Sequence, residues 1–296
     1  MATASPFKPA LVFSRCHAKG PNIGDPVDPV DHDASGLARE PELTGAESFN
    51  VLFAAVSHSP TLRNIWRAVY GLDYPEEADP FSFVTLTDLR RIAGELGVGR
   101  GQTMVDLACG RGGPGLWIAR DTGASLVGVD FSEVAVEEAR KRASQLGLSE
   151  HARFLVGSAD ATGLPESSLD AVMSVDSFWL FPDKPGAAAE VARILRPGGR
   201  FVFTTWDFDH APPGWPPQVP NHGDLLREAG FLLTTYEETP DWLRRQVAVY
   251  EGILKTQPGL VAELGKSAAS DMIAEALQMP AVLAQSRRVL VVARRP

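Results

Sequence analysis

The chain has 296 residues, and its 28 Lys and Arg against 37 Asp and Glu give a formal net charge of −9 at pH 7. An acidic surface repels nucleic-acid phosphates unless basic residues cluster strongly, and the few basic pairs of this sequence form no stripe. Two cysteines argue against a disulfide framework, and no apolar run is long enough for a signal-peptide core or a membrane span. We therefore expect a cytoplasmic protein with neither a nucleic-acid nor a membrane partner.

The sequence divides into an irregular start and a regular remainder. Residues 1–47 are rich in Pro, Gly and Asp, and their apolar residues recur at neither strand nor helix spacing, which predicts a flexible arm. In residues 48–80 apolar side chains recur at helical spacing, which predicts a helical cap. The main domain should then occupy residues 81–296 and open with a helix that ends at Gly97.

Short apolar segments alternate with amphipathic ones through the main domain. We expect strands over 104–107, 125–129, 152–156, 171–175, 200–205, 231–236 and 289–293. We expect helices over 114–120, 133–146, about 187–195 and 221–230, and a helical insertion from about 240 to 280. Strands that alternate with helices predict an α/β fold with a mainly parallel sheet covered on both faces. The late insertion should lie near the cap, where it could help to enclose a substrate.

A glycine-rich turn follows the first of these strands. The segment from Gly110 to Gly115 matches GxGxxG, a pattern that dinucleotide-binding domains also use. In this turn, however, Pro114 removes one helix-start donor, and Asp106 would repel a pyrophosphate. S-adenosylmethionine (SAM) has no phosphate and carries a sulfonium and an ammonium, so an acid at that place is compatible with it. The turn favours SAM, and an NAD(P)-dependent oxidoreductase remains the alternative.

Two further acids follow the next two strands. Asp130 ends the second strand, where a carboxylate can accept hydrogen bonds from both ribose hydroxyls of SAM or of NAD. Asp160 follows the third strand, where it could accept a hydrogen bond from an adenine amine.

The ordered series of motifs resembles that of class I SAM-dependent methyltransferases over about residues 86–236. The matching segments are Asp106-x-x-Cys109-Gly110-x-Gly112-Gly113, Gly128-Val129-Asp130-Phe131-Ser132, Gly157-x-x-Asp160, Leu169-Asp170-Ala171-Val172 and Leu195-Arg196-Pro197-Gly198-Gly199. The similarity is strongest to the small-molecule branch, which includes ubiquinone and menaquinone biosynthesis enzymes and natural-product methyltransferases. It implies a Rossmann-like seven-stranded sheet whose last strand, here 289–293, is antiparallel. It also implies methyl transfer from SAM to a small molecule of secondary metabolism, with S-adenosylhomocysteine (SAH) as product.

The resemblance also implies roles for individual residues. The cofactor site would consist of Asp106, Ala108, Gly110, Gly112, Asp130, Phe131, Ser132, Asp160, Ala161 and Val175. Within this set, Asp130 would hold the ribose, Phe131 would lie on the adenine face, and Asp160 would meet the adenine edge. The candidate substrate contacts are Ser177, Phe178, Trp179, Trp66 and Tyr70.

Methyl transfer requires little acid–base chemistry, because the sulfonium already activates the methyl group and in-line positioning with exclusion of water matters most. A hydroxyl acceptor would benefit from a general base, for which His210 and Asp176 are the candidates, with His58 and His222 behind them. We favour oxygen over nitrogen or carbon as the methylated atom. No acid cluster has the spacing of a Mg²⁺ site, so we expect no metal.

Two further questions stay open from the sequence. Proteins of this fold also include members that bind SAM and perform other chemistry. The apolar cap helices could cover the substrate or form the contact of a homodimer.

Overall fold

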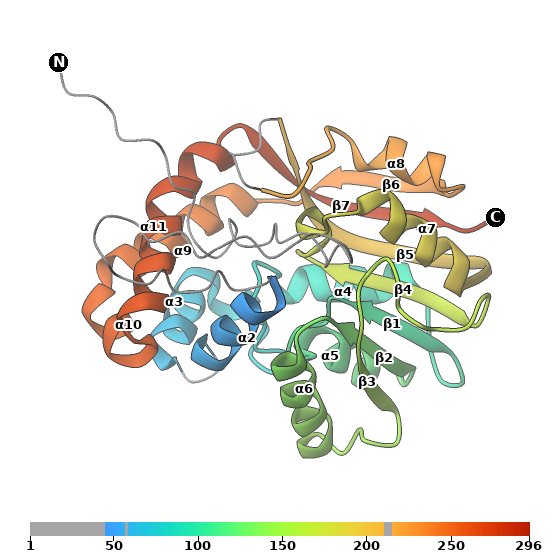
Figure 1. Ribbon diagram of the computed structural model, residues 1–296, viewed down its shortest axis with the longest axis horizontal. Coiled ribbons are helices and arrows are strands. Elements are labelled where there is room, and N and C mark those ends of the chain that lie inside the picture. Colours follow the sequence, from blue (N-terminus) through green and yellow to red (C-terminus); the bar gives the residue numbers. More distant parts are fainter. Residues whose placement is uncertain (1–44, 57–58, 210–214) are drawn as a thin grey trace, which may run out of the picture.

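The computed structural model describes residues 45–56, 59–209 and 215–296. Its centre is a seven-stranded sheet with the strand order β3-β2-β1-β4-β5-β7-β6 (Figure 1). The strands are β1 (Thr103–Leu107), β2 (Ser125–Asp130), β3 (Ala152–Val156), β4 (Leu169–Val175), β5 (Leu195–Phe208), β6 (Leu232–Glu238) and β7 (Ser286–Arg294). Strands β1 to β5 pair in parallel, whereas β7 lies antiparallel between β5 and β6. The predicted α/β class and the antiparallel last strand are both confirmed.

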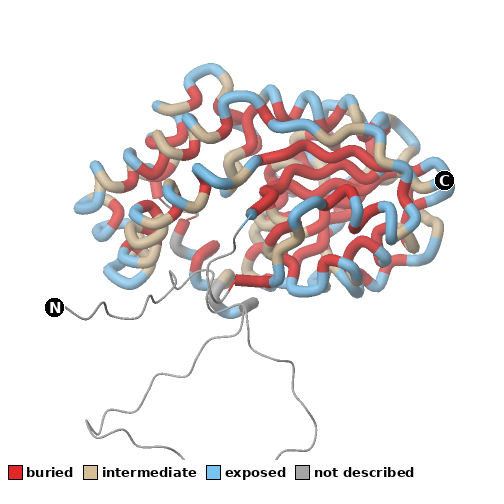
Figure 2. The backbone as a smooth tube through the Cα atoms, turned by 90° about the horizontal axis from the view of Figure 1, so that it is seen from above, coloured by how far each residue is buried: buried red, intermediate tan, exposed pale blue. Residues whose placement is uncertain are grey.

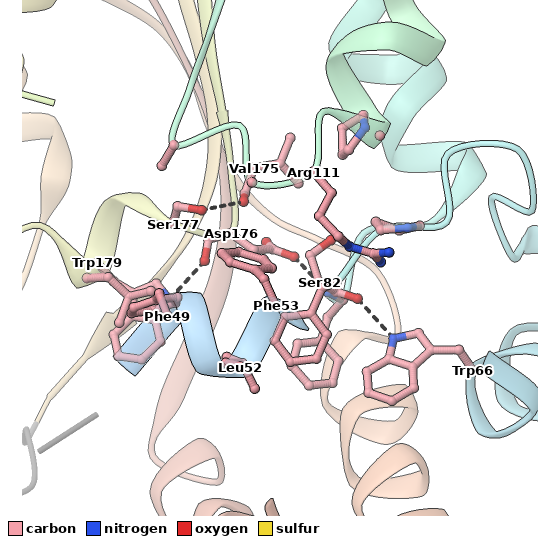
Figure 3. A pocket seen from close by; sticks show the side chains of 18 of the residues that line it. Phe49, Leu52, Phe53, Trp66, Ser82, Arg111, Val175, Asp176, Ser177 and Trp179 are labelled. Carbon is pink, nitrogen blue, oxygen red and sulfur yellow. Dashed lines mark hydrogen bonds between the residues drawn. The ribbon is translucent and has the colours of Figure 1, made fainter. Parts of the chain in front are cut away.

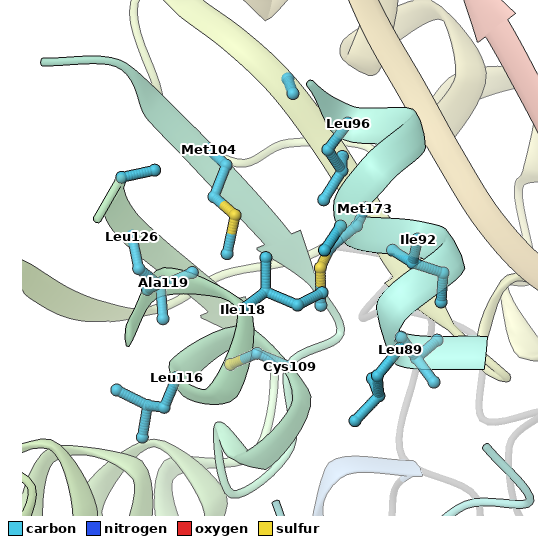
Figure 4. Packing of buried hydrophobic residues seen from close by; sticks show 14 of the residues in the cluster. Leu89, Ile92, Leu96, Met104, Cys109, Leu116, Ile118, Ala119, Leu126 and Met173 are labelled. Atoms are coloured by element: carbon cyan, nitrogen blue, oxygen red, sulfur yellow. The ribbon is translucent and has the colours of Figure 1, made fainter. Parts of the chain in front are cut away.

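Helices cover both faces of the sheet, and this explains why the central strands are apolar on both sides. On one face lie α4 (Leu86–Leu96), α5 (Gly113–Thr122) and α6 (Glu133–Gln145), with Ile118 packed against Met104 and Met173 of the sheet (Figure 4). On the other face lie α7 (Lys184–Ile194) and α8 (His222–Glu228). Figure 2 shows the buried strands at the centre of the molecule and the exposed residues around them. The carboxyl ends of β1, β2 and β4 are thereby left open to a ligand.

The cap and the late insertion form one helical layer beside these carboxyl ends (Figure 1). The cap consists of α2 (Gly45–Val56), α3 (Pro60–Tyr70) and the short η1 (Gly71–Asp73). The insertion consists of α9 (Trp242–Lys255), α10 (Gln257–Leu264) and α11 (Lys266–Leu283). Helix α9 packs on α3 and α11, and both groups contribute to one apolar cluster. The insertion therefore lies against the cap, as its late position in the sequence predicts.

Some element boundaries differ from the sequence-based expectation. Helix α2 already begins at Gly45, and the rest of the arm expected over residues 1–47 lies outside the described residues. Strand β5 was expected over 200–205 but starts at Leu195, which pairs with Leu169 before an irregularity in the β4–β5 register. Its other end continues to Phe208 because Trp206 to Phe208 pair with β7. None of the helices in the described parts of the chain is long and apolar enough to cross a membrane.

Two glycines give a stability test of this packing. A Cβ on Gly113, at the start of α5, would lie 2.0 Å from the carbonyl oxygen of Ala78, so the backbone would have to move. Gly113→Ala should therefore lower the free energy of unfolding by about 1–3 kcal/mol. Gly94→Ala is the matched control, because the space around Gly94 in α4 is open.

The control should raise the free energy of unfolding by about 0.5–1 kcal/mol, since alanine favours a helix over glycine. Urea denaturation followed by circular dichroism measures both changes. Equal effects of the two substitutions would contradict the close contact between α5 and Ala78.

Candidate active site

The turn between β1 and α5 contains three residues with positive φ: Ala108 (+58°), Gly110 (+51°) and Gly112 (+74°). Glycine adopts this conformation without steric cost, whereas Ala108 carries a Cβ that adds roughly 1–2 kcal/mol of strain. Ala108 and Gly110 line a cavity on the cap side of the turn. A Cβ on Gly110 would lie 3.3 Å from the Phe53 ring of α2, so the turn and the cap approach each other closely.

Gly112 does not take the place expected for it. It lines neither of the two cavities described below, and a Cβ there would lie 3.0 Å from both Ala139 of α6 and the Phe154 ring of β3. Its lack of a side chain therefore allows the turn to pack closely against α6 and β3, and its cofactor contact stays a prediction.

Asp106 is a buried acid beneath the turn. Its side chain is 2% exposed, and Oδ2 has no hydrogen-bond partner among the described residues. Burial, and next the charge of Asp130, raise the pKa of the Asp106 carboxyl to about 8. A cation bound beside it would favour its ionised form.

Asp130 closes the turn from the end of β2. Its Oδ2 accepts a hydrogen bond from the Gly110 N–H (2.8 Å), and its Oδ1 accepts one from the Ser132 N–H (2.9 Å). Burial raises the pKa of Asp130 to about 6, and these N–H groups oppose that rise. Ser132 was expected in the cofactor site, but it is fully buried, caps α6 through the Ala135 N–H, and donates a hydrogen bond to Asn50 of α2. It therefore links the cap to the sheet, and its cofactor contact stays a prediction.

Two cavities meet at this turn. The first, which we call the turn–cap cavity, has a volume of about 180 Å³ and lies between the turn, the ends of β4 and β5, and helices α2, α3, α9 and α11 (Figure 3). The second, the strand-edge cavity, has a volume of about 300 Å³ and lies along the ends of β2 and β3. The residues that line both are Phe49, Phe53, Ala108, Ser177 and Leu180.

The predicted site residues divide between the cavities. Asp130, Phe131 and Asp160 line the strand-edge cavity. Ala161 lines neither cavity and instead bridges to Ser158. The turn–cap cavity is lined by Asp106, Ala108, Gly110, Val175, Asp176, Ser177, Trp179 and Trp66 from the predicted set (Figure 3).

Two expected substrate contacts face elsewhere. Phe178 is fully buried in the core, where it stacks on Phe203 at a centroid distance of 4.8 Å. It follows the end of β4, but the short η2 (Phe178–Leu180) directs it into the sheet packing while Trp179 lines the cavity. Tyr70 lies behind the cavity wall, and its hydroxyl donates a hydrogen bond to the Phe83 carbonyl.

The candidate bases are placed less favourably than the sequence suggests. Asp176 is buried and accepts hydrogen bonds from the Arg288 guanidinium (2.9 Å), the Thr204 hydroxyl (2.8 Å) and the Phe83 N–H (3.0 Å). His222 lines neither cavity; its Nδ1 lies 2.8 Å from Asp207 on the far side of β5. His210 and His58 lie outside the described residues. The assignment of a general base stays a prediction.

The structure also adds residues that the sequence did not single out. Arg63, Arg111 and Arg142 surround Asp79, with nitrogen–oxygen distances of 3.0, 3.7 and 4.0 Å. Arg111 lies in the glycine turn itself, so its place in the motif could have identified it as a site residue. Arg63 comes from α3 and Arg142 from α6, outside the motif. On the opposite wall, three polar residues of α9 and α11 line the turn–cap cavity: Gln246, Tyr250 and Glu275. No sequence motif marks them.

Comparisons with known proteins agree with this geometry. The family described as "Methyltransferase domain" matches residues 105–203. The methyltransferase GfsG of Streptomyces halstedii is 35% identical over 131 residues, which are 44% of this chain and 46% of that protein. A sterol 24-C-methyltransferase of Yarrowia lipolytica is 27% identical over 188 residues, which are 62% of this chain and 46% of that protein. The chain thus spans less than half the length of these relatives.

Solved structures share the fold. The cyclopropane synthase MmaA2 of Mycobacterium tuberculosis has a TM-score of 0.66 at 15% identity, over 83% of this chain and 98% of that one. The [4+2]-cyclase SpnF has a TM-score of 0.63 at 24% identity, over 70% of this chain and 80% of that one. Residues 105–203 of this chain thus match a methyltransferase domain, and its seven-stranded sheet has the fold of these solved structures.

Proposed function

We propose that this protein transfers the methyl group of SAM to a small, largely apolar molecule held in the turn–cap cavity. The observation that carries the proposal is the junction of two cavities at Ala108 and Ser177, with an acid beneath the turn on one side and acids along the strand edge on the other. SAM has two parts that suit these two sides. The acid beneath the turn suits the ammonium group of the methionine part, and the acids along the strand edge suit the hydroxyl and amine donors of the adenosine part.

The strand-edge cavity fits the adenosine part. Asp130 lines it and has carboxylate lone pairs beyond the two that accept backbone N–H groups, so it can accept ribose hydroxyls. Phe131 is 38% exposed and presents a ring to the same cavity, and Asp160 lies at its edge. These positions agree with the roles that the family resemblance implies for the three residues.

The turn–cap cavity fits the methionine part. Oδ2 of Asp106 lacks a partner and can accept a hydrogen bond from the ammonium group. Three arginines around the single carboxylate of Asp79 leave an excess of two positive charges, and Arg111 and Arg142 both line the cavity. Burial lowers the pKa of the Arg111 guanidinium, so a carboxylate bound there would be favourable. We therefore assign the methionine carboxylate to Arg111 and Arg142.

The same contacts disfavour a nicotinamide dinucleotide. A pyrophosphate at this helix start would lie near the buried acid Asp106. The Gly110 N–H, which could otherwise bind a phosphate oxygen, already donates to Asp130, and Pro114 contributes no N–H.

The protein's part in the reaction is positioning and exclusion of water. Bound SAM supplies an electrophilic methyl group at the junction of the cavities. The aromatic wall formed by Phe53, Trp66, Trp179 and Trp206 is suited to hold an apolar acceptor against that junction without water. Because Asp176 is bound by Arg288, it orients the end of β4 instead of standing free to accept a proton.

The acceptor atom and its metabolic setting remain proposals. Relatives named in the comparisons include sterol 24-C-methyltransferases and a probable tocopherol O-methyltransferase of Oryza sativa subsp. japonica. We keep oxygen as the proposed atom and a secondary metabolite as the proposed acceptor, since the apolar cavity suits such molecules. The [4+2]-cyclase among the structural neighbours has the same fold, so non-methylating chemistry is the second candidate.

Calorimetry should separate SAM from NADH and test Asp106. We expect SAM and SAH to bind and NADH to fail. The affinity for SAM should increase from about pH 6 to about pH 7.5, because the Asp106 carboxyl, with its pKa of about 8, becomes ionised as pH rises. Asp106→Asn should reduce this dependence to the smaller part that comes from Asp130, whose pKa is about 6.

Stability should respond in the opposite direction. Folding raises the pKa of the Asp106 carboxyl from near 4 to near 8. The folded protein therefore holds this proton more tightly than the unfolded chain, and the free energy of unfolding falls as pH rises through this range. The ligand-free protein should therefore lose stability over this range, and Asp106→Asn should lose less. Tight binding of NADH, or a pH profile that Asp106→Asn leaves unchanged, would contradict the assignment.

The role of Arg111 can be tested with two ligands. Arg111→Met should weaken SAH binding by about 10-fold or more, since charge-assisted hydrogen bonds contribute about 1.5–3 kcal/mol. It should leave unchanged the affinity for 5′-methylthioadenosine, which lacks the amino acid part. Arg120→Met on α5 is the control, because Arg120 pairs with exposed Glu77 and lines neither cavity. Equal losses for both ligands would show a structural effect.

Methyl transfer itself can be detected with SAM whose methyl group carries deuterium. Incubation with an organic extract of the source cells should yield a product that mass spectrometry identifies by one labelled methyl group. Binding of SAM without any labelled product would favour the non-methylating alternative.

A further inference from the structure

The wall that α9 and α11 contribute to the turn–cap cavity carries polar side chains in apolar surroundings. Gln246 and Tyr250 lie one turn apart on α9, and Glu275 faces them from α11. We call these three residues the distal polar cluster. Their neighbours in the cavity wall are apolar: Ile253, Met272, Met279 and Leu283. Such a cluster is unfavourable in an apolar layer unless its hydrogen bonds are completed.

One hydrogen-bond acceptor of this cluster lacks a donor. The Tyr250 hydroxyl donates to Glu275 Oε1 (3.0 Å) and accepts from Gln246 Nε2 (3.4 Å). Gln246 Oε1 is buried without a partner within the described part of the chain. Because Tyr250 uses its only proton on Glu275, the amide nitrogen of Gln246 must face Tyr250 and the amide oxygen stays free. Burial raises the pKa of Glu275 to about 7, and no Arg or Lys among the described residues pairs with its carboxyl group.

These groups define what a ligand must offer. The free atoms of the cluster are acceptors, an amide oxygen and a carboxylate, so they require a hydrogen-bond donor. The basic residues in the cavity wall are Arg111 and Arg142, and both lie at the turn beside Asp79. The Trp206 indole N–H in the cavity wall is a donor without a partner among the residues that the structure describes, but one neutral donor does not balance an anion. An anionic head group would therefore be repelled here.

The cavity wall beside this cluster is aromatic. Phe83 contacts Trp66, Trp206 and Tyr250 at centroid distances of 5.7, 6.1 and 5.8 Å. The turn–cap cavity has a volume of about 180 Å³ and would also receive the methionine part of SAM, so the acceptor must be a small apolar body. The wall is thus suited to an aromatic or hydrocarbon body that joins a reactive end to a polar end.

We propose that the distal polar cluster binds a hydrogen-bond-donating head group, a hydroxyl or an amine, of an apolar acceptor whose opposite end receives the methyl group. Gln246 and Glu275 are then specificity-determining residues that fix the acceptor's direction in the cavity. The inference rests on the proposed function, because it is the bound SAM that defines the reactive end.

Binding of simple probes to the SAH-loaded protein tests this assignment. The probes are 2-phenylethylamine, 2-phenylethanol and 3-phenylpropionate, which share an apolar body and differ in the head group. Calorimetry should show that the amine or the alcohol binds at least 10-fold more tightly than the carboxylate. Whichever of the two binds more tightly identifies the head group.

Matched variants assign the effect to the cluster. Glu275→Gln should weaken the preferred probe at least 10-fold, and Glu251→Gln, an exposed acid of α9 paired with Lys255, should not. The proposal is overturned if the carboxylate binds as tightly as the others, if no probe binds the SAH-loaded protein, or if Glu275→Gln binds the probes normally.

Two further readouts separate this proposal from its alternatives. Glu275→Leu should keep or raise the midpoint of thermal unfolding, because a polar cluster retained for binding costs stability. A clear fall in that midpoint would show that the cluster is structural and would overturn the assignment. SAH affinity should be the same in all variants, and a wild-type protein that fails to bind SAH would refute the proposed function instead.

Discussion

The position of the end of β4, where the two cavities meet, depends on one buried cation. Arg288 of β7 is 1% exposed and donates hydrogen bonds to Asp176 at the end of β4 and to Asp88 of α4. Removing one partner from such a group leaves an uncompensated buried charge, which costs about 3–5 kcal/mol. The guanidinium also lies over the Trp206 ring at 5.7 Å. Arg288 therefore ties the last strand to the strand end where the two cavities meet.

This interaction explains the shape of the backbone around it. Asp176 has a φ of +56°, a conformation that the surrounding hydrogen bonds must hold in place. The second oxygen of its carboxylate accepts the Phe83 N–H, which fixes the segment that carries the aromatic wall. The antiparallel strand of this fold thus contributes directly to the site, although it supplies no residue that lines the cavities.

Under the proposed function, the cap would determine which molecule reaches the methyl donor. Phe49 and Phe53 of α2 line both cavities, and Ser132 of the sheet domain binds Asn50 of the same helix. In the proposed arrangement, the sheet forms the cofactor side, and α3, α9 and α11 form the acceptor side. This division accounts for a family match confined to residues 105–203, since the segments that surround the acceptor lie outside it.

The sequence predicted well those features that depend on neighbours along the chain. Strand and helix order, the turn and the antiparallel last strand follow from local periodicity and from the motif series. It predicted poorly the direction of individual side chains. Phe178 and Trp179 are adjacent, yet η2 buries one in the core and directs the other into the cavity. Gly112 and Ser132 have motif positions that serve packing and capping.

Residues brought together by packing between distant helices gave no sequence signal at all. Glu275 and Gln246 are 29 positions apart (275 − 246 = 29), on two helices whose apolar faces resemble those of any buried helix. Their meeting depends on how α9 and α11 pack against the cap, which periodicity does not specify.

The crystal structure of the SAH complex tests the central claim most directly. We predict adenosine in the strand-edge cavity beside Asp130, Phe131 and Asp160, and the amino acid part in the turn–cap cavity between Asp106 and Arg111. The sulfur should then lie at the junction near Ala108 and Ser177. SAH bound in the reverse direction, or outside these two cavities, would contradict the account.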